Sequence, residues 1–349
     1  MQQVTVGLIG CGVMGNVALD TASRLDSVQI AAVADVRKEA ADQAAEKYAA
    51  KAVYYDGAEL LRDSNIQAVI IAMPTCWRVE LAMQAFSAGK HVLLEKPVAM
   101  NASQVRRMIK ARGNLIAGCC SSRYQFYDST KAATAFIATG VMGSIRLIRV
   151  RALGSAKPPG KTPPPWRLKT DLNGGGILMN WGCYDLDYIF SLFGWKLQPA
   201  LVLGRTWPLA RKFAACATPD SDAETHAAAF ILCKDGTAIS FERGEFAAAR
   251  EEAAWDIIGT QGSLYLYMTP AEDKKIIYTK GNDDCSVSEE IIWQGKENWQ
   301  TGSADVVIDF IEAVRQNRPP GTDLEKALLI QKTTDAIYLS ARQGKAVEI

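Results

Sequence analysis

The feature that most constrains the fold is a regular alternation of short apolar runs and helical segments in the first third of the chain. The apolar runs are residues 4–9, 28–34, 68–72, 91–94 and 115–118. The segments with helical spacing between them are residues 14–24, 38–49, 78–88 and 102–112. Buried strands that alternate with amphipathic helices are typical of a parallel sheet with helical crossovers. We therefore predict a doubly wound α/β domain, a Rossmann fold, over residues 1–120.

The rest of the chain has a different pattern, in which apolar strands between residues 200 and 294 are joined by turns such as Asp235-Gly236. A further strand is predicted at 144–153, followed by a proline-rich loop at 157–165 that proline keeps out of regular structure. The predicted helices of this part are residues 126–139, 177–193, 303–316 and 323–343. Consecutive strands joined by tight turns pair antiparallel. We predict a second, α+β domain over residues 121–349 with a large, mostly antiparallel sheet.

The composition excludes several classes of protein. Of 349 residues, 39 are Lys or Arg and 38 are Asp or Glu, which leaves a net charge of +1. Such a chain has no excess of positive charge for binding nucleic acid. It also lacks an apolar run of roughly 18 residues, so we predict no membrane-spanning helix. Because His91 and His226 are the only histidines, a three-histidine metal site is excluded, and we expect no bound metal.

The eight cysteines are scattered, without any C-x-x-C pair. A zinc ribbon needs closely spaced thiolate pairs, and a disulfide scaffold needs many cysteines in a short chain. Since most of the cysteines stand among apolar or small residues, we interpret them as reduced thiols. The N-terminus lacks the pattern of a signal peptide. These observations predict a cytoplasmic protein.

A glycine-rich motif, G-x-G-x-x-G over residues 10–15, stands between the first predicted strand and the first helix. Its glycines allow a tight turn, close approach of a pyrophosphate and close packing of helix on strand, and the helix N-terminus attracts phosphate. Asp35 follows at the end of the second strand, where a carboxylate can bind ribose hydroxyls and repels a 2′-phosphate. NAD is therefore the expected cofactor. NADP stays possible, because Arg37 and Lys38 could receive a 2′-phosphate.

Two further clusters carry groups suited to chemistry. Lys96 follows the predicted strand at 91–94, at the strand edge where open α/β sheets bind their ligands. Three glycines at 174–176 open the helix near 177–193, and glycine lets another backbone or a ligand approach closely. Asn180, Tyr184 and Asp187 follow at helical spacing, so we expect them on one face. A lined pocket and a solvated face both fit this pattern.

These residues together resemble the glucose–fructose oxidoreductase, inositol dehydrogenase and MocA family of sugar oxidoreductases, over nearly the whole chain. The segments that carry the resemblance are the glycine motif, Met73-Pro74-Thr75, Ala88-Gly89-Lys90-His91-Val92, Glu95-Lys96-Pro97, Trp166-Arg167, the triple-glycine helix and residues 336–349. The resemblance implies that the cofactor is bound by Gly10, Gly12, Val13, Met14, Gly15, Asp35, Arg37, Met73, Pro74, Glu95, Lys96 and Pro97. It also implies a homodimer or homotetramer.

The chain departs from the family pattern at the helix. Many members have Asp where Asn180 stands and His where Tyr184 stands, and use that pair to transfer protons. The tyrosine instead resembles the branch that contains glucose–fructose oxidoreductase and dimeric dihydrodiol dehydrogenase. The family's histidine after the Pro-Thr turn is replaced by Arg78, to which the sequence assigns no role.

We predict reversible hydride transfer between nicotinamide and a sugar, cyclitol or related polyol, with Tyr184 as acid/base. Free tyrosine has a pKa near ~10, and the Lys96 ammonium together with oxidised nicotinamide would lower it. Asn180 and Asp187 would orient the substrate, with Asp185 a less certain neighbour. Arg123, Trp166 and Arg167 are candidates for lining the sugar pocket, or equally for structural roles.

Other functions stay open. The chain could be a nicotinamide-dependent glycosidase or elimination enzyme that oxidises a sugar only transiently, or a non-catalytic sensor of nucleotide or sugar. The physiological direction, oxidation or reduction, also stays open.

Overall fold

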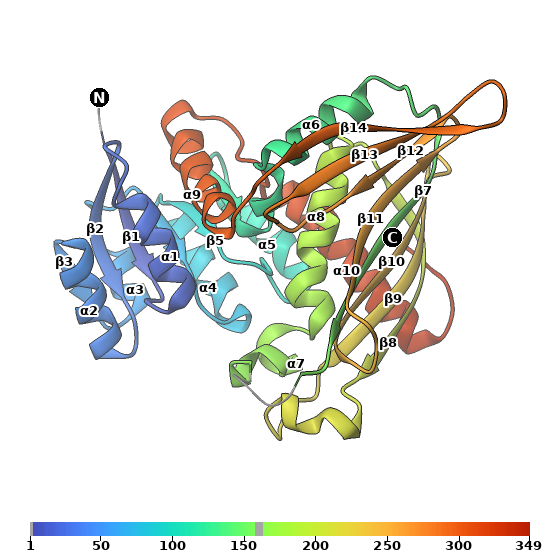
Figure 1. Cartoon of the computed structure of the whole chain (residues 1–349). Helices are drawn as coiled ribbons and strands as arrows, with labels where there is room; N and C mark the ends of the chain where they lie inside the picture. The colour runs from blue at the N-terminus through green and yellow to red at the C-terminus, as the bar shows by residue number, and fades with distance from the viewer. Residues whose placement is uncertain (1–2, 158–162) are drawn as a thin grey trace. The chain divides into compact units, whose positions relative to one another are not determined.

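The computed structural model describes residues 3–157 and 163–349, so five residues of the predicted proline-rich loop, 158–162, lie outside it (Figure 1). The chain divides into two compact units: Met1–Arg123 with Gln300–Leu329 (unit 1), and Tyr124–Trp299 with Ile330–Ile349 (unit 2). A boundary at residue 120 assigns Gln300–Leu329 to the second domain, whereas the structure packs this segment with the first. The reason is visible at Gly118, where a side chain would meet Phe310 and Pro320.

Unit 1 is built on a six-stranded sheet in the order β3-β2-β1-β4-β5-β6, with every pair parallel. Its strands are β1 (Val4–Ile9), β2 (Val28–Ala34), β3 (Ala52–Tyr54), β4 (Ala68–Ile71), β5 (His91–Leu94) and β6 (Ala117–Cys119). Its helices are α1 (Val13–Ala22), α2 (Lys38–Tyr48), α3 (Gly57–Leu61), α4 (Thr75–Ser87), α5 (Ala102–Arg112) and most of α9 (Trp299–Gln316). The predicted Rossmann fold is confirmed. Strand β3 and helix α3 were missed because each is too short to show a period.

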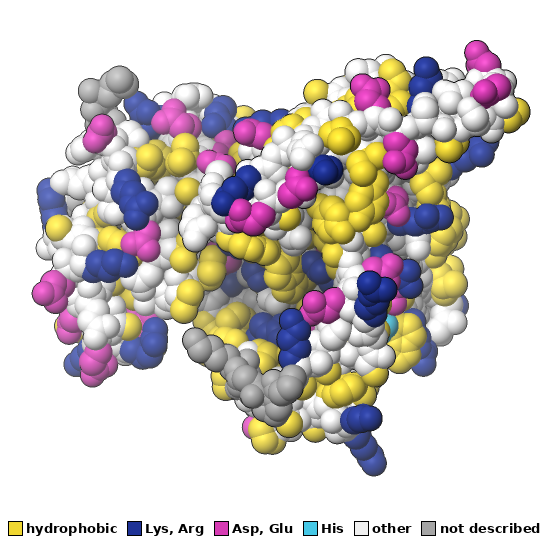
Figure 2. All heavy atoms as spheres, viewed as in Figure 1, with side chains coloured by type: hydrophobic (Ala, Val, Ile, Leu, Met, Phe, Trp, Pro, Cys, Tyr) yellow, Lys and Arg dark blue, Asp and Glu magenta, His cyan; other side chains and the backbone are white. Residues whose placement is uncertain are grey.

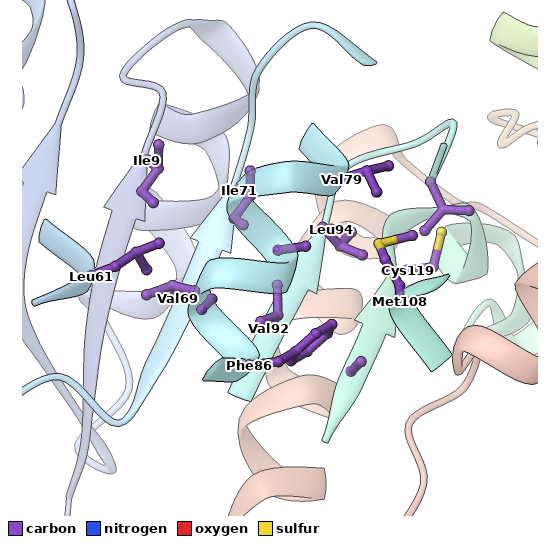
Figure 3. Close-up of a cluster of buried hydrophobic side chains, with 14 of the residues drawn as sticks. Ile9, Leu61, Val69, Ile71, Val79, Phe86, Val92, Leu94, Met108 and Cys119 are labelled. Carbon is purple, nitrogen blue, oxygen red and sulfur yellow. The ribbon is translucent and has the colours of Figure 1, made fainter. Parts of the chain in front are cut away.

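The core of unit 1 lies between the sheet and its helices. Ile71, Val92 and Leu94 point from neighbouring strands toward Val79 and Phe86 of α4 (Figure 3). These strands are buried on both faces and therefore read as continuous apolar runs rather than as an alternation. The packing fixes the carboxyl ends of β1, β2, β4 and β5, where the predicted cofactor residues begin.

Unit 2 is built on a nine-stranded sheet in the order β14-β13-β12-β11-β7-β10-β9-β8-β15, in which only β7 and β10 pair parallel. Its strands are β7 (Ile145–Ser155), β8 (Pro199–Pro208), β9 (Glu224–Cys233), β10 (Ala238–Ala247), β11 (Glu252–Gly259), β12 (Gly262–Leu266), β13 (Lys274–Gly281), β14 (Val287–Gly295) and β15 (Val347–Glu348). The predicted turn at Asp235-Gly236 joins β9 to β10, and the turn between β11 and β12 likewise joins antiparallel strands. The predicted mostly antiparallel sheet is confirmed.

The helices of unit 2 are α6 (Asp128–Ala138), the short α7 (Thr170–Asn173), α8 (Cys183–Leu192) and the second half of α10 (Leu324–Gln343). Two of them cover the same face of the sheet. Gly182, just before α8, lies against Phe241 of β10, and Ile337 of α10 lies against Gly204 of β8. Phe241 and Gly204 both pair with Ala229 of β9, so they belong to one face. The opposite face exposes Leu203 and Phe230, which are cross-strand neighbours.

Basic and acidic side chains are mixed over the visible surface in Figure 2, as the net charge of +1 leads one to expect. Among the described residues, no helix is long and apolar enough to cross a membrane. A cytoplasmic location stays a prediction from the sequence.

Candidate active site

The glycine motif of unit 1 forms the turn from β1 into α1. Gly10 has φ +98°, and a side chain on it would lie 2.2 Å from the Ala72 carbonyl oxygen. A side chain on Gly15 would lie 2.0 Å from the Gly10 carbonyl oxygen. Gly12 differs, because no described heavy atom lies within 4 Å of where its Cβ would be. Gly10 and Gly15 are therefore required by the fold itself, whereas Gly12 leaves space at the start of α1.

The start of α1 suits an anion. Gly12 is its N-cap residue and supplies no side-chain cap, and no acidic residue stands in the first turn. The first N–H groups of such a helix carry a partial positive charge that attracts phosphate. The Asn16 amide donates to the carbonyl oxygens of Cys11 and Gly12, each at 2.9 Å, and so holds the turn in shape. The turn fits the pyrophosphate of a dinucleotide.

Asp35 lies at the carboxyl end of β2, beside this turn. One carboxylate oxygen accepts from the Cys11 backbone N–H at 2.8 Å and the other from the Arg37 N–H at 2.9 Å. The Arg37 guanidinium reaches both oxygens at 3.2 Å. Partial burial favours the neutral acid, but the hydrogen bonds from Arg37 and Cys11 outweigh burial and lower the pKa of Asp35. Asp35 is thus a fixed carboxylate, suited to accepting ribose hydroxyls.

Lys96 belongs to the turn that follows β5, and its peptide bond to Pro97 is cis. The buried Glu95 carboxylate accepts the Lys96 backbone N–H at 3.0 Å. Arg78 of α4, which the sequence left without a role, is buried here and donates to the carbonyl oxygens of Met73 and Pro97. One guanidinium thereby ties the turn after β4 to the turn after β5. Arg78 holds the backbone on which Met73, Pro74 and Lys96 are presented.

In unit 2, side-chain and backbone atoms of the protein occupy the space beside the triple-glycine segment. A side chain on Gly176 would lie 1.7 Å from the Glu224 carbonyl oxygen, and one on Gly175 would lie 2.0 Å from the Tyr338 hydroxyl. The Glu224 carboxylate accepts the N–H groups of Gly176 at 2.8 Å and Leu178 at 3.0 Å. It also accepts the Tyr338 hydroxyl at 2.8 Å. These glycines admit a neighbouring strand and an internal carboxylate, which fix the helix start.

The helix that follows contains a π-helical turn, Leu178–Gly182, before the regular α8. Asn180 lies within this turn, so α-helical spacing does not carry from Asn180 to Tyr184. Tyr184 and Asp187 do share a side of α8, because they contact consecutive residues of one segment. Tyr184 packs edge-on against Tyr124 with ring centres 5.1 Å apart, and Asp187 accepts the Gln125 amide. Asn180, Tyr184 and Asp187 are all buried.

Asp185 points toward the sheet. Its carboxylate pairs with the Arg243 guanidinium of β10 at 3.0 Å and accepts the Trp255 indole N–H of β11 at 3.2 Å. Burial raises the pKa of Asp185, and Arg243 and Trp255 oppose that shift. The pair anchors α8 to β10 and β11. Asp185 is therefore an internal structural acid and not the substrate-side neighbour considered from the sequence.

Comparison with known proteins agrees with this arrangement. Residues 4–114 match the family model described as "Oxidoreductase family, NAD-binding Rossmann fold". Residues 135–349 match its companion, "Oxidoreductase family, C-terminal alpha/beta domain". The chain belongs to the glucose–fructose oxidoreductase, inositol dehydrogenase and MocA family. It is an oxidoreductase with an NAD-binding Rossmann domain, as predicted.

Full-length relatives lie within this family. Myo-inositol 2-dehydrogenase of Thermotoga maritima is 23% identical over 349 residues, covering 99% of each chain. D-glucoside 3-dehydrogenase of Escherichia coli K12 is 25% identical over 358 residues, covering 99% of this chain and 97% of the relative. The solved structure of a levoglucosan dehydrogenase in complex with NADH has a TM-score of 0.85 and 22% identity, covering 100% and 99% of the two chains. At that identity the last likeness shows the fold.

Some predicted substrate residues have structural partners in this family member. Arg167 forms two parallel hydrogen bonds with Glu245, at 3.0 and 2.9 Å. Trp166 is half-buried in the same short helical turn, Pro165–Leu168. Arg123 is half-buried at the end of unit 1. Substrate contacts of these three residues stay predictions.

Both histidines have structural contacts. His91 Nδ1 accepts the Ile116 N–H at 2.9 Å, and burial lowers the pKa of His91. His226 bonds Glu242 at 3.0 Å and packs against Trp207 with ring centres 5.1 Å apart.

Sequence reasoning missed three aromatic residues near Tyr184: Tyr124 and Trp181, which contact its ring, and Trp299, which contacts both of them. Tyr124 and Trp299 come from segments far apart in the sequence, and no local pattern marks either one. Trp181 stands on the helix that follows the triple glycine, next to Asn180, and could have been found there. An aromatic residue beside a candidate acid/base is a usable signal when ring-shaped substrates are considered.

Proposed function

We propose that the protein is an NAD-dependent dehydrogenase that transfers a hydride between nicotinamide and a carbinol carbon of a sugar, cyclitol or related polyol. Unit 1 provides the cofactor groups: the open start of α1, the fixed Asp35 carboxylate and the turn that carries Lys96. Unit 2 provides a helix whose polar groups are held in place. The observation that supports the proposal is the position of Tyr184. Its phenol is buried on a helix that neighbouring side chains hold in place, in a chain whose family has an NAD-binding Rossmann domain.

The proton and the hydride leave the substrate separately. Oxidation moves the hydroxyl proton to the Tyr184 phenolate while the hydride leaves the carbon, and reduction returns the proton from the phenol. Bound nicotinamide supplies the hydride acceptor or donor. The Lys96 ammonium stabilises the phenolate and the developing alkoxide. Asn180 and Asp187 orient the substrate or the phenol, and Gln125 in turn holds Asp187.

The residues of unit 2 support this assignment by their rigidity. Tyr184 is packed edge-on against both Tyr124 and Trp181, the latter with ring centres 5.5 Å apart. The helix that carries it is fixed at its start by Glu224 and along its length by the Asp185–Arg243 pair. A proton-transfer group has to be held in one geometry to act on one hydroxyl. These contacts provide such a geometry.

The test compares three variants across a panel of inositols, aldoses and keto sugars, with turnover followed at the NADH absorbance band. Tyr184→Phe should lower kcat at least about a hundredfold, the lower range for general acid–base catalysis, with NAD affinity unchanged. Lys96→Ala should lower kcat similarly and shift the rise of the oxidation rate to higher pH. Tyr188→Phe removes the same hydroxyl from a buried tyrosine of the same helix and should leave kcat within about twofold, since it touches no reacting atom.

The same panel separates the other functions. Release of an aglycone without net NADH would replace the dehydrogenase by an enzyme that oxidises its sugar only transiently. NAD binding without an absorbance change on any substrate, in either direction, would favour a sensor. Unchanged turnover in Tyr184→Phe on a confirmed substrate would remove Tyr184 from the proton transfer.

We infer a homodimer or homotetramer formed through the face of the nine-stranded sheet that the described helices of unit 2 leave uncovered. Leu203 of β8 and Phe230 and Leu232 of β9 are 53, 47 and 39% exposed on adjoining strands. A contiguous apolar patch of this kind marks an association surface. Light scattering should give a mass of two or four chains, and Phe230→Glu should lower it. A wild-type monomer at micromolar concentration would rule the interface out.

A further inference from the structure

Four aromatic rings of unit 2, one of which is Tyr184, form a closed cluster. Tyr124, Tyr184, Trp181 and Trp299 meet in sequence around the cluster, with neighbouring ring centres 5.1, 5.5, 6.3 and 6.1 Å apart. The planes of successive rings cross at 60 to 83°. These are edge-to-face contacts in which each ring touches the next. Because neighbouring rings contact one another, a ligand would bind on the outer surface of the cluster.

The two tryptophans carry the outer surface of this cluster. Tyr124 and Tyr184 are 1 and 2% exposed, whereas Trp181 is half-buried and Trp299 is 45% exposed. Trp181 contacts Tyr184 directly, and Trp299 extends the apolar surface outward through its contacts with Trp181 and Tyr124. Such a surface stabilises the C–H face of a ring-shaped molecule.

A buried polar network fixes the segment that presents Trp299. The Lys274 ammonium, fully buried, pairs with Glu297 at 2.7 Å, and the second Glu297 oxygen accepts the Ser129 N–H at 3.0 Å. The Tyr127 hydroxyl donates to the carbonyl oxygen of Asn298 at 2.9 Å. The two residues before Trp299 are therefore locked to α6 and β13. An exposed aromatic ring on a rigid support loses little entropy when it binds a ligand.

A cationic side chain, Arg243, lies against the Trp181 ring. The Arg243 guanidinium stands 4.7 Å from the centre of the Trp181 ring, and Asp185 holds it there. The ring face that attracts cations is thereby already used by the protein. A second positive charge placed on the outer surface would be repelled by the guanidinium across the ring. The surface favours neutral ring substrates over protonated amino sugars.

We propose that Trp299 and Trp181 form a substrate platform beside Tyr184 that selects uncharged, ring-shaped polyols with an apolar face. This inference rests on the proposed function, because it names the substrate class of the same site. It predicts weak binding of acyclic polyols, which present no continuous C–H face. It also predicts discrimination against a ring that carries an ammonium group.

The test measures binding in the presence of NADH, so that no turnover is required. The probes are methyl α-glucoside, its 2-amino-2-deoxy counterpart and sorbitol, followed by titration calorimetry and saturation-transfer NMR. The wild type should bind the neutral ring about tenfold more tightly than either other probe, the factor that about 1.4 kcal/mol produces. Trp299→Ala should lose about tenfold for the neutral ring, and Trp299→Phe should recover part of that loss.

The matched control is Trp293→Ala, which removes a half-buried indole from β14, outside the cluster. It should leave the affinity for methyl α-glucoside unchanged, and NADH affinity should be the same in every variant. Equal binding of the neutral ring by the wild type and Trp299→Ala overturns the platform, as does equal or tighter binding of sorbitol or the amino sugar by the wild type. A ring that binds as expected but is never oxidised refutes the proposed function and leaves the platform intact.

Discussion

The two glycine-rich helix starts of this protein have similar compositions and opposite uses. In unit 1, Gly12 caps α1 without a side-chain acceptor, and no described atom lies near its Cβ position. In unit 2, the Glu224 backbone occupies the space where a Gly176 side chain would lie. The Glu224 carboxylate accepts the N–H groups at the helix start, where an external anion would otherwise bind. One start is open to an external phosphate, and the other is closed by an internal carboxylate. Glycine content alone does not distinguish a ligand site from a packing site.

The acid–base pairs of the two units differ in the same way. Asp35 and Arg37 pair at the edge of unit 1, with the Arg37 side chain 63% exposed. Asp185 and Arg243 pair inside unit 2, with the Asp185 side chain fully buried. The first pair stays available to a ligand, and the second stabilises the helix that carries Tyr184. Unit 1 presents its polar groups outward, while unit 2 uses equivalent groups to hold the helix that carries Tyr184.

The same substitution, Gly to Ala, should have very different consequences in the two glycine motifs. Gly176→Ala places a methyl group 1.7 Å from the Glu224 carbonyl oxygen. We expect the free energy of unfolding to fall by about 4 kcal/mol or more, which lowers Tm by about 10 °C in a unit of this size. Gly12→Ala should change Tm by only a degree or two and raise the Kd for NAD at least about tenfold.

Thermal melts and NADH fluorescence titrations check both variants. A Gly176→Ala protein with wild-type Tm would show that the close approach of Glu224 is not required. A Gly12→Ala protein with wild-type NAD affinity would show that the pyrophosphate does not use the start of α1.

The sequence predicted the open start better than the closed one, for a physical reason. The groups that define the first site, Gly10 to Gly15 and Asp35, are close in the sequence, and their spacing is the signal. The groups that close the second come from β9 and α10, with Glu224 46 residues beyond Leu178 and Tyr338 114 residues beyond Glu224. No local spacing encodes contacts of that range.

The π-helical turn before α8 was also missed, because it too lacks a local sequence signal. Helical spacing correctly placed Tyr184 and Asp187 on one side, but the π-helical turn that contains Asn180 leaves no periodic signature. Both sheets followed from strand patterns, whereas the return of Gln300–Leu329 to unit 1 depends on packing against Gly118. The roles of Lys96 and Tyr184 stay predictions that kinetics must test.

The next largest loss of stability is expected when the buried Asp185–Arg243 pair is broken. Arg243→Met leaves the Asp185 carboxylate buried with only the Trp255 indole as donor, and loss of one partner of such a pair costs about 3 kcal/mol. Burial already raises the pKa of Asp185, and loss of the guanidinium raises it further. The neutral acid is tolerated in the folded state and the carboxylate is not. The loss of stability should therefore be small near pH 4 and grow as pH rises through the raised pKa.

Melts of wild type and variant at pH 5 and pH 8 check the sign. The control is Arg107→Met, which removes an arginine that pairs with Glu80 at the surface of unit 1, with its side chain 48% exposed. Exposed pairs contribute at most about 1 kcal/mol, so this variant should melt close to wild type at both values. A deficit in Arg243→Met that is equal at pH 5 and pH 8 would show that Asp185 does not titrate in this interval.

The smallest effect is expected at the exposed pair of unit 1. Arg37→Ala removes the guanidinium from Asp35 but leaves the Cys11 N–H on the carboxylate. Loss of the guanidinium raises the pKa of Asp35 from its lowered position, but the backbone N–H groups of Cys11 and residue 37 still bind the carboxylate, so NAD affinity at neutral pH should stay within about twofold. NADP, whose 2′-phosphate loses its nearest cation, should bind several-fold more weakly. Both cofactors are titrated against the wild type and Arg37→Ala. If NAD affinity falls as far as in Gly12→Ala, Arg37 is required to hold Asp35 in its binding geometry. The Asp35–Arg37 pair would then have a structural role, like the Asp185–Arg243 pair of unit 2.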